Sequence, residues 1–369
     1  MSDVIFTPAI LGELLKTELK ARGTTQKEFA EAIGIRPSHL NEIIKGKRQI
    51  PSDLLAPIAS VLSVSVDKLI ESQTYNEIGR KKGKLLSVED AEAEKVLIDY
   101  DQIVSTKSLL RNLSTSNATA RQRLDMLQEE YRLPSPEMLM NKFCQLGNRC
   151  FRRSTKNGLD ARMIFTWALK ARRAARINPV VFPYDETKNQ ELALKLCDIF
   201  HQNTDTLDKV NRLLGEYGMG FIIVEKEEHA SVDGYSFFIE GHPYIAITNR
   251  YKRIDNLAFT VMHECGHISL GHTNEKSSMI NVDERALEYG DDTPLEQAEI
   301  AADDFATNIL IPQKVWCLTP RVPINPYVIQ RVFTDWANER GLNEWIVLGR
   351  VSHETGMYRF RSNSKRNIN

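Results

Sequence analysis

Two histidines spaced four residues apart, His263 and His267, form the pattern with the clearest chemistry in this sequence. On a helix this spacing points both imidazoles from one face toward a single ion, and zinc is a metal that histidine pairs of this kind bind. Glu264 follows the first histidine and can reach water at the metal as a general base. The pattern predicts a helix whose chemistry is the metal-assisted hydrolysis of an amide bond.

A catalytic zinc site built on two histidines needs a third protein ligand, because such sites usually hold three protein ligands and a water. Glu299 and Asp303 are four residues apart in a later segment whose apolar positions predict a helix. Glu299 can bind the metal, and Asp303 can accept the free N–H of a ligating histidine and so fix its tautomer. Two other residues remain candidates for the third ligand. One is Glu296, although Asp303 would then be too far away to cooperate with it, and the other is His272, nine residues after the first histidine.

A second pattern, near the amino terminus, is typical of DNA readers. Thr25 is a good helix N-cap, and Glu28 three residues later completes a capping box. Gly34 supplies the positive φ of a turn, and Pro37 then stands in the first turn of the next helix, where its missing N–H costs nothing. These residues predict a helix-turn-helix, whose second helix enters the major groove. Its outward side would carry Ser38, His39, Asn41, Glu42 and Lys45.

Overall composition sets only broad limits. The 369 residues are enough for two or three domains, and 42% hydrophobic residues with a net charge of −1 are ordinary for a globular protein. Residues 1–70 hold nine Lys and Arg against eight Asp and Glu. So small a surplus predicts modest non-specific affinity for DNA and favours binding as a homodimer.

The sequence also indicates a compartment. No run of about 18 apolar residues occurs, so we expect no membrane span. The first residues lack the basic leader of a secretory signal. Five irregularly spaced cysteines, an odd number, favour free thiols in a reducing cytosol, so we expect a cytoplasmic protein.

The elements that would position these residues are mostly helical. Apolar residues at helical spacing predict helices over 88–133, 137–150, 160–177, 188–215, 253–272, 295–311 and 327–340. Three runs rich in β-branched and aromatic residues predict a three-stranded antiparallel meander, with turns at Asp233-Gly234 and Gly241, over 219–225, 235–240 and 242–248. A short strand pair is expected in the tail. The fold class is therefore mainly α with a small antiparallel sheet, an α+β protein.

We expect four regions along the chain. An all-α helix-turn-helix bundle over 1–72 would precede a helical connector over 73–180, which opens with a polar stretch at 75–84. A metallopeptidase domain over 181–320 would follow, with a carboxy-terminal extension over 321–369. The strand at 244–248 could pair with an extended substrate.

The amino-terminal region resembles the Xre family of phage-repressor-like regulators over roughly residues 7–70, and within it the HigA-type antitoxins. The resemblance implies that Gln26 contacts a phosphate of double-stranded operator DNA. Ser38, His39 and Glu42 would face base edges. Lys45, Lys47 and Arg48 would meet the DNA backbone electrostatically.

Residues 210–315 resemble the ImmA/IrrE family of bacterial metallopeptidases, through the pattern Phe-Thr-x-x-His-Glu-x-x-His and the pattern Glu-x-x-Ala-Asp-x-Phe-Ala. The second pattern supports Glu299 over Glu296 as third ligand, in the arrangement of the gluzincins. The resemblance implies Zn²⁺ as cofactor and a repressor or antitoxin as protein substrate. Met262 departs from the family, which more often has Ala there, and Cys265 lies inside the motif.

Two functions fit this sequence. The first is a transcriptional regulator with a zinc endopeptidase that cleaves a repressor or antitoxin, either itself or a partner, with 75–84 and 133–136 as candidate cut sites. The second is a non-enzymatic HigA-like antitoxin or transcription factor, whose peptidase-like domain senses a ligand or binds a partner. No oxyanion-stabilising residue is evident, and the weak candidates are His242, Tyr244, His272 and Tyr289.

Overall fold

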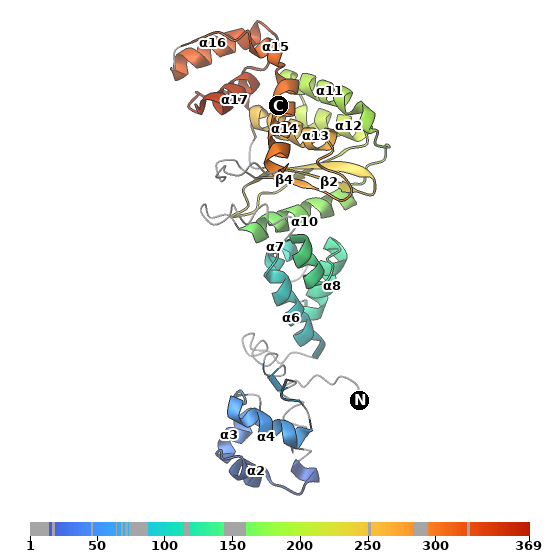
Figure 1. Ribbon diagram of the computed structural model, residues 1–369, viewed down its shortest axis with the longest axis vertical. Coiled ribbons are helices and arrows are strands. Elements are labelled where there is room, and N and C mark those ends of the chain that lie inside the picture. The colour runs from blue at the N-terminus through green and yellow to red at the C-terminus, as the bar shows by residue number, and fades with distance from the viewer. Residues whose placement is uncertain are drawn as a thin grey trace. The chain divides into compact units, whose positions relative to one another are not determined.

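The computed structural model divides into two compact units, Met1–Leu139 and Met140–Asn369. The residues that it describes are 15–16, 19–45, 47–63, 65–67, 69–70, 73, 88–111, 113, 118–143, 160–249, 252–282, 294–322 and 325–369. Figure 1 shows the course of the chain, and each unit is considered by itself. The expected linker at 75–84 lies outside the described residues, as do Tyr289, Cys144 and Cys150.

Three short helices form the predicted helix-turn-helix bundle: α2 (Gln26–Ala32), α3 (Pro37–Ile44) and α4 (Ser52–Leu62). The capping box is present, since the Glu28 backbone N–H donates to Thr25 and the Thr25 N–H donates to the Glu28 carboxylate. Gly34 has a φ of 76° in the turn, and Pro37 begins α3. Both local predictions are confirmed. The core beneath these helices is formed by residues that include Leu19, Phe29, Leu40, Ile43, Ile58 and Leu69.

Beyond this bundle, the described residues of the first unit form α6 (Val88–Asp101), α7 (Thr106–Leu110) and α8 (Ala120–Tyr131) with short connections. Two tyrosines tie these elements together, because Tyr131 of α8 donates to the carbonyl of Leu109 in α7 and Tyr100 of α6 donates to that of Pro134 in the loop after α8. Leu133 is buried next to this second bond. The segment 133–136, a candidate cut site, is thus held in the folded structure, and local unfolding would have to precede its cleavage.

A four-stranded mixed sheet is the centre of the second unit, with β1 (Gly220–Val224), β2 (Val232–Ile239), β3 (His242–Thr248) and β4 (Met279–Val282) in the order β1-β3-β2-β4. The expectation of an antiparallel meander is wrong, because β1 pairs with β3 in parallel. Only β2 and β3 form the expected hairpin, whose turn residues Glu240 and Gly241 both have positive φ. Asp233-Gly234 is no turn but lies within β2, beside a register shift.

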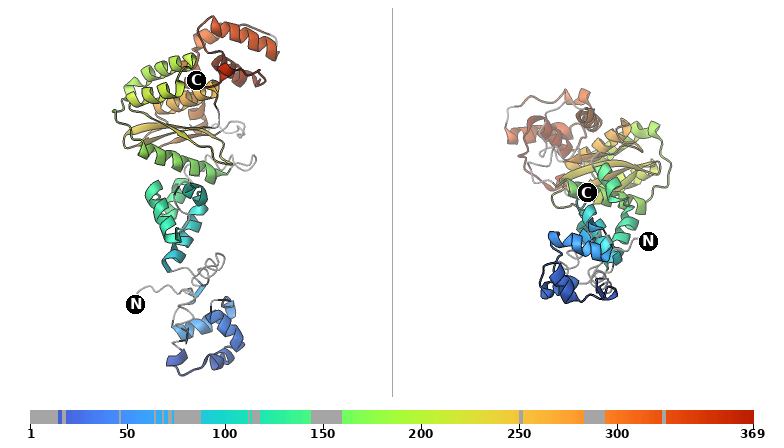
Figure 2. Two further views of the ribbon diagram at one scale, coloured as in Figure 1. Left: turned by 180° about the vertical axis from the view of Figure 1, so that it is seen from behind. Right: turned by 60° about the horizontal axis from the view of Figure 1, so that its bottom comes forward.

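Helices cover both faces of this sheet (Figure 2). The helix α10 (Ala161–Ile177) packs against Tyr244 and Ala246 on one face. On the other face, Ile245 and Ile247 pack with α11 (Asn189–Gln202), α12 (Thr206–Glu216) and α13 (Ile254–Ser269). The alternation of side chains along β3 therefore buries this strand on both sides.

Four more helices follow towards the carboxy terminus: α14 (Pro294–Leu310), α15 (Gln313–Trp316), α16 (Pro326–Asn338) and α17 (Glu344–Thr355). Two single helical turns lie elsewhere, one before α11 at Glu186–Lys188 and one after α17 at Ser364–Arg366. The expected strand pair in the tail is wrong, because the apolar run at 345–348 belongs to α17 and is buried in the core. Asn343 caps that helix and Gly356, with a φ of 68°, ends it. The mainly α character with a small sheet is confirmed. Among the described residues, no helix has the length and apolar character needed to cross a membrane.

Candidate functional site

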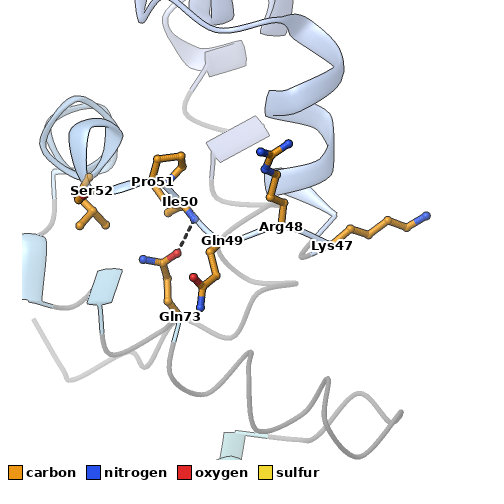
Figure 3. A pocket seen from close by; sticks show the side chains of 8 residues that line it. Lys47, Arg48, Gln49, Ile50, Pro51, Ser52 and Gln73 are labelled. Atoms are coloured by element: carbon orange, nitrogen blue, oxygen red, sulfur yellow. Dashed lines mark hydrogen bonds between the residues drawn. The ribbon is translucent and has the colours of Figure 1, made fainter.

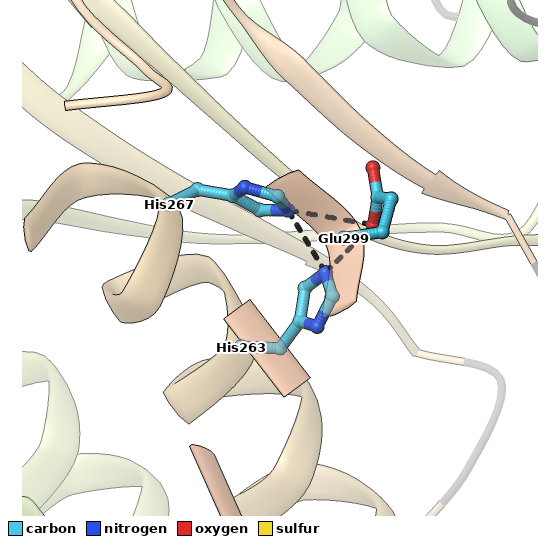
Figure 4. A group of neighbouring side chains, drawn as sticks. All are labelled: His263, His267 and Glu299. Atoms are coloured by element: carbon cyan, nitrogen blue, oxygen red, sulfur yellow. Dashed lines mark hydrogen bonds and ion pairs between the residues drawn. The ribbon is translucent and has the colours of Figure 1, made fainter. Parts of the chain in front are cut away.

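The helix α13 brings the two histidines of the motif to the same point. His263 and His267 are 4% and 0% exposed, and their Nε2 atoms lie 2.9 Å apart. Almost all of the helix is buried, so its register is fixed by packing on several sides. The two imidazoles meet edge to face, with both Nε2 atoms directed at one position (Figure 4).

The third candidate ligand, a carboxylate, comes from α14 (Pro294–Leu310), which runs close beside α13. At Gly266 an added Cβ would lie 3.2 Å from both the Cα and the carbonyl oxygen of Ala302, so the absence of a side chain there favours the close approach of the two helices. Glu299 is thereby placed with Oε2 3.1 Å from His263 Nε2 and 3.5 Å from His267 Nε2. Among the described residues, the group able to hold a metal consists of His263, His267 and Glu299, with ligand atoms within 4.8 Å of one another. Neither Glu296 nor His272 belongs to it.

The donors of this group fit a cation. Asp303 Oδ1 lies 2.6 Å from His263 Nδ1, which donates its proton there. Burial opposes a charge on His263, but the hydrogen bonds to Asp303 and Glu299 outweigh it and raise the pKa of this imidazole well above its usual value. Burial lowers the pKa of His267. The pKa of Glu299 falls to about 2, since the bonds to both histidines outweigh the effect of burial. The site therefore favours a positive charge between the two Nε2 atoms, and a zinc ion bound there would supply that charge.

Glu264 lies beside this group and is completely buried. Neither of its carboxylate oxygens has a hydrogen-bond partner among the described residues. Burial raises its pKa to about 8, although the charge of His263 and the nearby Ser236 hydroxyl lower it. Gly234 of β2 passes so close that an added Cβ would lie 2.3 Å from Glu264 Oε1. An unpartnered buried carboxyl group of this kind can exchange a proton with a bound water.

His263 and Asp303 also line a cavity of about 380 Å³. It is bounded by α13, α14 and α17, and its lining includes Asp255, Phe259, Thr260, Asn281, Arg350 and Arg366. Arg253 and Arg366 both pair with Asp255 at the start of α13. The cavity is large enough to receive a side chain of a peptide next to the candidate metal position.

Three expectations about the surroundings of this site are corrected. The strand at 244–248 cannot pair with a substrate, because β3 is hydrogen-bonded to β1 and β2 on its two sides. The edge strands of the described sheet are β1 and β4, and Asn281 of β4 lines the cavity. Tyr244 packs on the opposite face of the sheet, where its hydroxyl accepts the Val180 N–H. His242 bonds the carbonyl of Gly218, so neither residue serves an oxyanion.

The structure also brings in residues that the sequence did not single out. Gly234 looked like part of a turn, and Ser236 and Thr273 carried no signal at all. The hydroxyls of Ser236 and Thr273 lie 2.9 Å apart, and this contact ties β2 to the turn that follows α13. A glycine flanked by strand-forming residues was the one available sign of a close approach.

The residues predicted to contact DNA lie on and around α3. All but one are exposed: Gln26, Ser38, Asn41, Glu42, Lys45, Lys47 and Arg48. His39 is half-buried, and its Nε2 has no hydrogen-bond partner among the described residues. Glu42 lies 3.7 Å from Arg48, a weak pair in which both side chains are exposed.

A hollow follows α3, where the chain turns into α4 (Figure 3). Lys47 and Arg48 line it together with the start of α4 at Ser52. Gln73 closes one side, since its side-chain oxygen accepts the Ile50 N–H. Pro51 gives α4 no side-chain cap, and the basic side chains of Lys47 and Arg48 lie near the start of this helix, an arrangement that favours phosphate contacts.

Comparison with known proteins agrees with this arrangement. Residues 15–69 match the helix-turn-helix family. The chain is 38% identical over 60 residues to the uncharacterized HTH-type transcriptional regulator YazB of Bacillus subtilis (strain 168), a match that covers 16% of this chain and 87% of YazB. The chain belongs to the helix-turn-helix family of transcriptional regulators. The HigA-like subtype stays a prediction.

The second unit of this helix-turn-helix regulator matches another family. Residues 221–316 match the IrrE N-terminal-like domain, a range that contains the sheet, α13 and α14. The regulator is thus a DNA-binding helix-turn-helix domain fused to an IrrE-like domain. No solved structure matches the chain.

Proposed function

We propose that this regulator carries a zinc-dependent endopeptidase, which cleaves a repressor or an antitoxin, itself or a partner, and so switches gene expression. One observation carries the proposal. The convergence of His263 Nε2, His267 Nε2 and Glu299 Oε2 on one point leaves the unpartnered carboxyl group of Glu264 beside it. A structural zinc site would need neither an open position nor a buried general base next to it.

His263, His267 and Glu299 would hold the ion, and Asp303 would keep His263 in the tautomer that offers Nε2. When bound, zinc supplies a Lewis acid that polarises the scissile carbonyl and acidifies water at the site. Glu264, ionised beside the bound cation, accepts the proton of the attacking water and delivers it to the leaving amide nitrogen. Among the described strands, β4 is at the end of the sheet next to the cavity, and an extended peptide paired with it would place a side chain in the cavity beside His263.

The proposal requires an extended substrate segment, because a strand can be added to a sheet edge only by a chain that is itself unpaired. A linker of a repressor meets this requirement better than its folded core does. On the DNA side, we propose that the helix-turn-helix domain binds a palindromic operator as a homodimer, which places two α3 helices in successive major grooves.

The test uses purified full-length protein, loaded with zinc and incubated with a library of unfolded peptides. Mass spectrometry would count new amino termini for the wild type and for Glu264→Gln. Cleavage by the wild type that Glu264→Gln lacks supports the endopeptidase. If both preparations leave the library intact although zinc is bound, the enzymatic function is wrong, and the domain acts by binding alone.

A further inference from the structure

The turn after α13 returns a third histidine to the site. Gly271, with a φ of 74°, reverses the chain directly after the helix, and His272 follows it. The Nδ1 of His272 then lies 3.1 Å from the Nδ1 of His267. This is the edge of the His267 ring that faces away from His263 and Glu299.

A contact between two imidazole nitrogens at this distance requires one proton between them. The Nε2 of His267 faces His263 Nε2 and Glu299 Oε2, and there it must present a lone pair to a cation. A neutral His267 therefore carries its proton on Nδ1 and donates it to His272. The Nδ1 of His272 is the acceptor, so it cannot be a ligand of the same ion.

The turn is fixed firmly enough to hold such a contact. The backbone N–H of Thr273 donates to the carbonyl of His267 at 3.1 Å, and its buried hydroxyl lies 2.9 Å from that of Ser236. His272, which lies between Gly271 and Thr273, is thus held by a turn that is anchored both to the end of α13 and to β2. His272 is placed by the backbone rather than by chance packing of its ring.

We propose that His272 is a positioning residue, which accepts the Nδ1 proton of His267 and so directs the Nε2 lone pair of that histidine into the metal site. This inference rests on the metal-binding part of the proposed function. The two histidines are then oriented by different partners, since His263 donates to the carboxylate of Asp303. An uncharged partner for His267 adds no further negative charge to a centre that already contains the carboxylates of Glu299 and Asp303.

The experiment measures the tautomer and the zinc affinity of the full-length protein, neither of which depends on peptidase activity. Long-range ¹H–¹⁵N correlation spectra of zinc-loaded protein, assigned with a His267→Gln variant, would place the His267 proton on Nδ1. Competition with a chromophoric chelator would then compare the wild type with His272→Ala and His272→Asn. His242→Ala is the matched control, a histidine of the same domain that bonds the Gly218 carbonyl instead.

We expect His272→Ala to weaken zinc binding by roughly 10–100-fold, the range for partners that orient metal ligands. His272→Asn should recover part of this loss, because its side-chain oxygen can accept the same proton. His242→Ala should bind zinc as the wild type does. Wild-type affinity in His272→Ala, or a His267 proton found on Nε2, overturns the inference.

Failure of the proposed function would look different. If zinc binds with the expected dependence on His272 but no peptide is cleaved, the positioning role stands and the endopeptidase does not. If His263→Ala binds as much zinc as the wild type, the metal site itself is misassigned. The circular dichroism spectrum of each variant separates these outcomes from misfolding.

Discussion

Asp303 Oδ1 and His263 Nδ1 lie 2.6 Å apart, so a carboxylate on α14 orients an imidazole on α13. Removing this carboxylate by Asp303→Ala should weaken zinc binding by roughly 10–100-fold without abolishing it, because His263, His267 and Glu299 remain. The measurement is a chelator competition at fixed pH.

Asp304→Ala is the matched control for this change. Asp304 is the neighbouring acid on the same helix, but its side chain is exposed and does not contact His263. Equal losses in both variants would mean that the effect comes from general charge rather than from the contact with His263.

Glu264→Gln should keep the metal and the fold but remove the proton acceptor. The amide has the size of the carboxyl group, so it fits beside Gly234, and its loss of basicity should slow cleavage by at least about 10²-fold. The rate is measured on a peptide identified from the library, and zinc content by metal analysis. A variant that cleaves as fast as the wild type would exclude Glu264 as general base.

The sequence predicted the elements that local signals define. Thr25, Gly34 and Pro37 specify caps and a turn within a few residues, and they predicted α2 and α3 correctly. The spacing of His263 and His267 also needed no information beyond one helix. The nearness of Glu299 and Asp303 to them was predicted from the spacing on a second helix, together with a family resemblance.

Features that depend on distant pairing were mispredicted. The parallel pairing of β1 with β3 depends on how the sheet packs between α10 and α13. The order of the strands along the sequence does not predict this pairing. Gly234 resembled a turn residue because Asp-Gly is a common turn sequence. Its close approach to Glu264 arises only because β2 packs against α13. A strand pair was expected in the tail, where the structure has α17, because a helix buried on nearly all sides at 344–348 lacks the usual periodicity.

Gly234→Ala should disturb the site through a single added methyl group. Its Cβ would lie 2.3 Å from Glu264 Oε1, and such overpacking typically costs about 1–3 kcal/mol of stability. The loss should shrink when Glu264→Ala removes the obstructing atoms, so a double-mutant cycle by urea unfolding measures the contact directly.

Gly215→Ala serves as the control for this cycle. Gly215 lies in α12 with open space around its Cα, and alanine there should stabilise the helix by up to about 1 kcal/mol. Additive effects of Gly234→Ala and Glu264→Ala would show that the two residues do not touch.

DNA recognition should divide between base and phosphate contacts. Ser38→Ala combined with His39→Ala should weaken binding to the specific operator far more than binding to unrelated DNA. Lys47→Ala and Arg48→Ala should weaken both nearly equally, and each should reduce the slope of affinity against salt by about one. Ser60→Ala, on the exposed side of α4, is the control. Gel-shift titrations at several salt concentrations measure these effects, and equal losses on both DNAs for the Ser38 and His39 changes would exclude base reading by α3.

His201 should make the second unit sensitive to acid. Its Nε2 lies 2.8 Å from the Leu310 carbonyl, to which it donates, and its Nδ1 accepts the Asn343 N–H at 3.0 Å, so the folded protein needs the neutral ring. Burial lowers the pKa of His201, although the bond to Leu310 opposes this effect. A histidine with a lowered pKa stabilises the fold fully above its unfolded pKa of about 6.5. That stability is lost as the pH falls below this value, by at most about 1.4 kcal/mol per pH unit.

All four tryptophans, at positions 167, 316, 336 and 345, belong to the second unit, so their fluorescence reports its unfolding alone. Urea titrations of zinc-free protein between pH 7.5 and 5 should show a smaller pH dependence in His201→Gln than in the wild type. The exposed Gln202 on the same helix provides the control, since Gln202→Ala removes no titrating group. An unchanged pH dependence in His201→Gln would mean that His201 is protonated as easily in the folded state as in the unfolded state, and the buried neutral ring would be the wrong description.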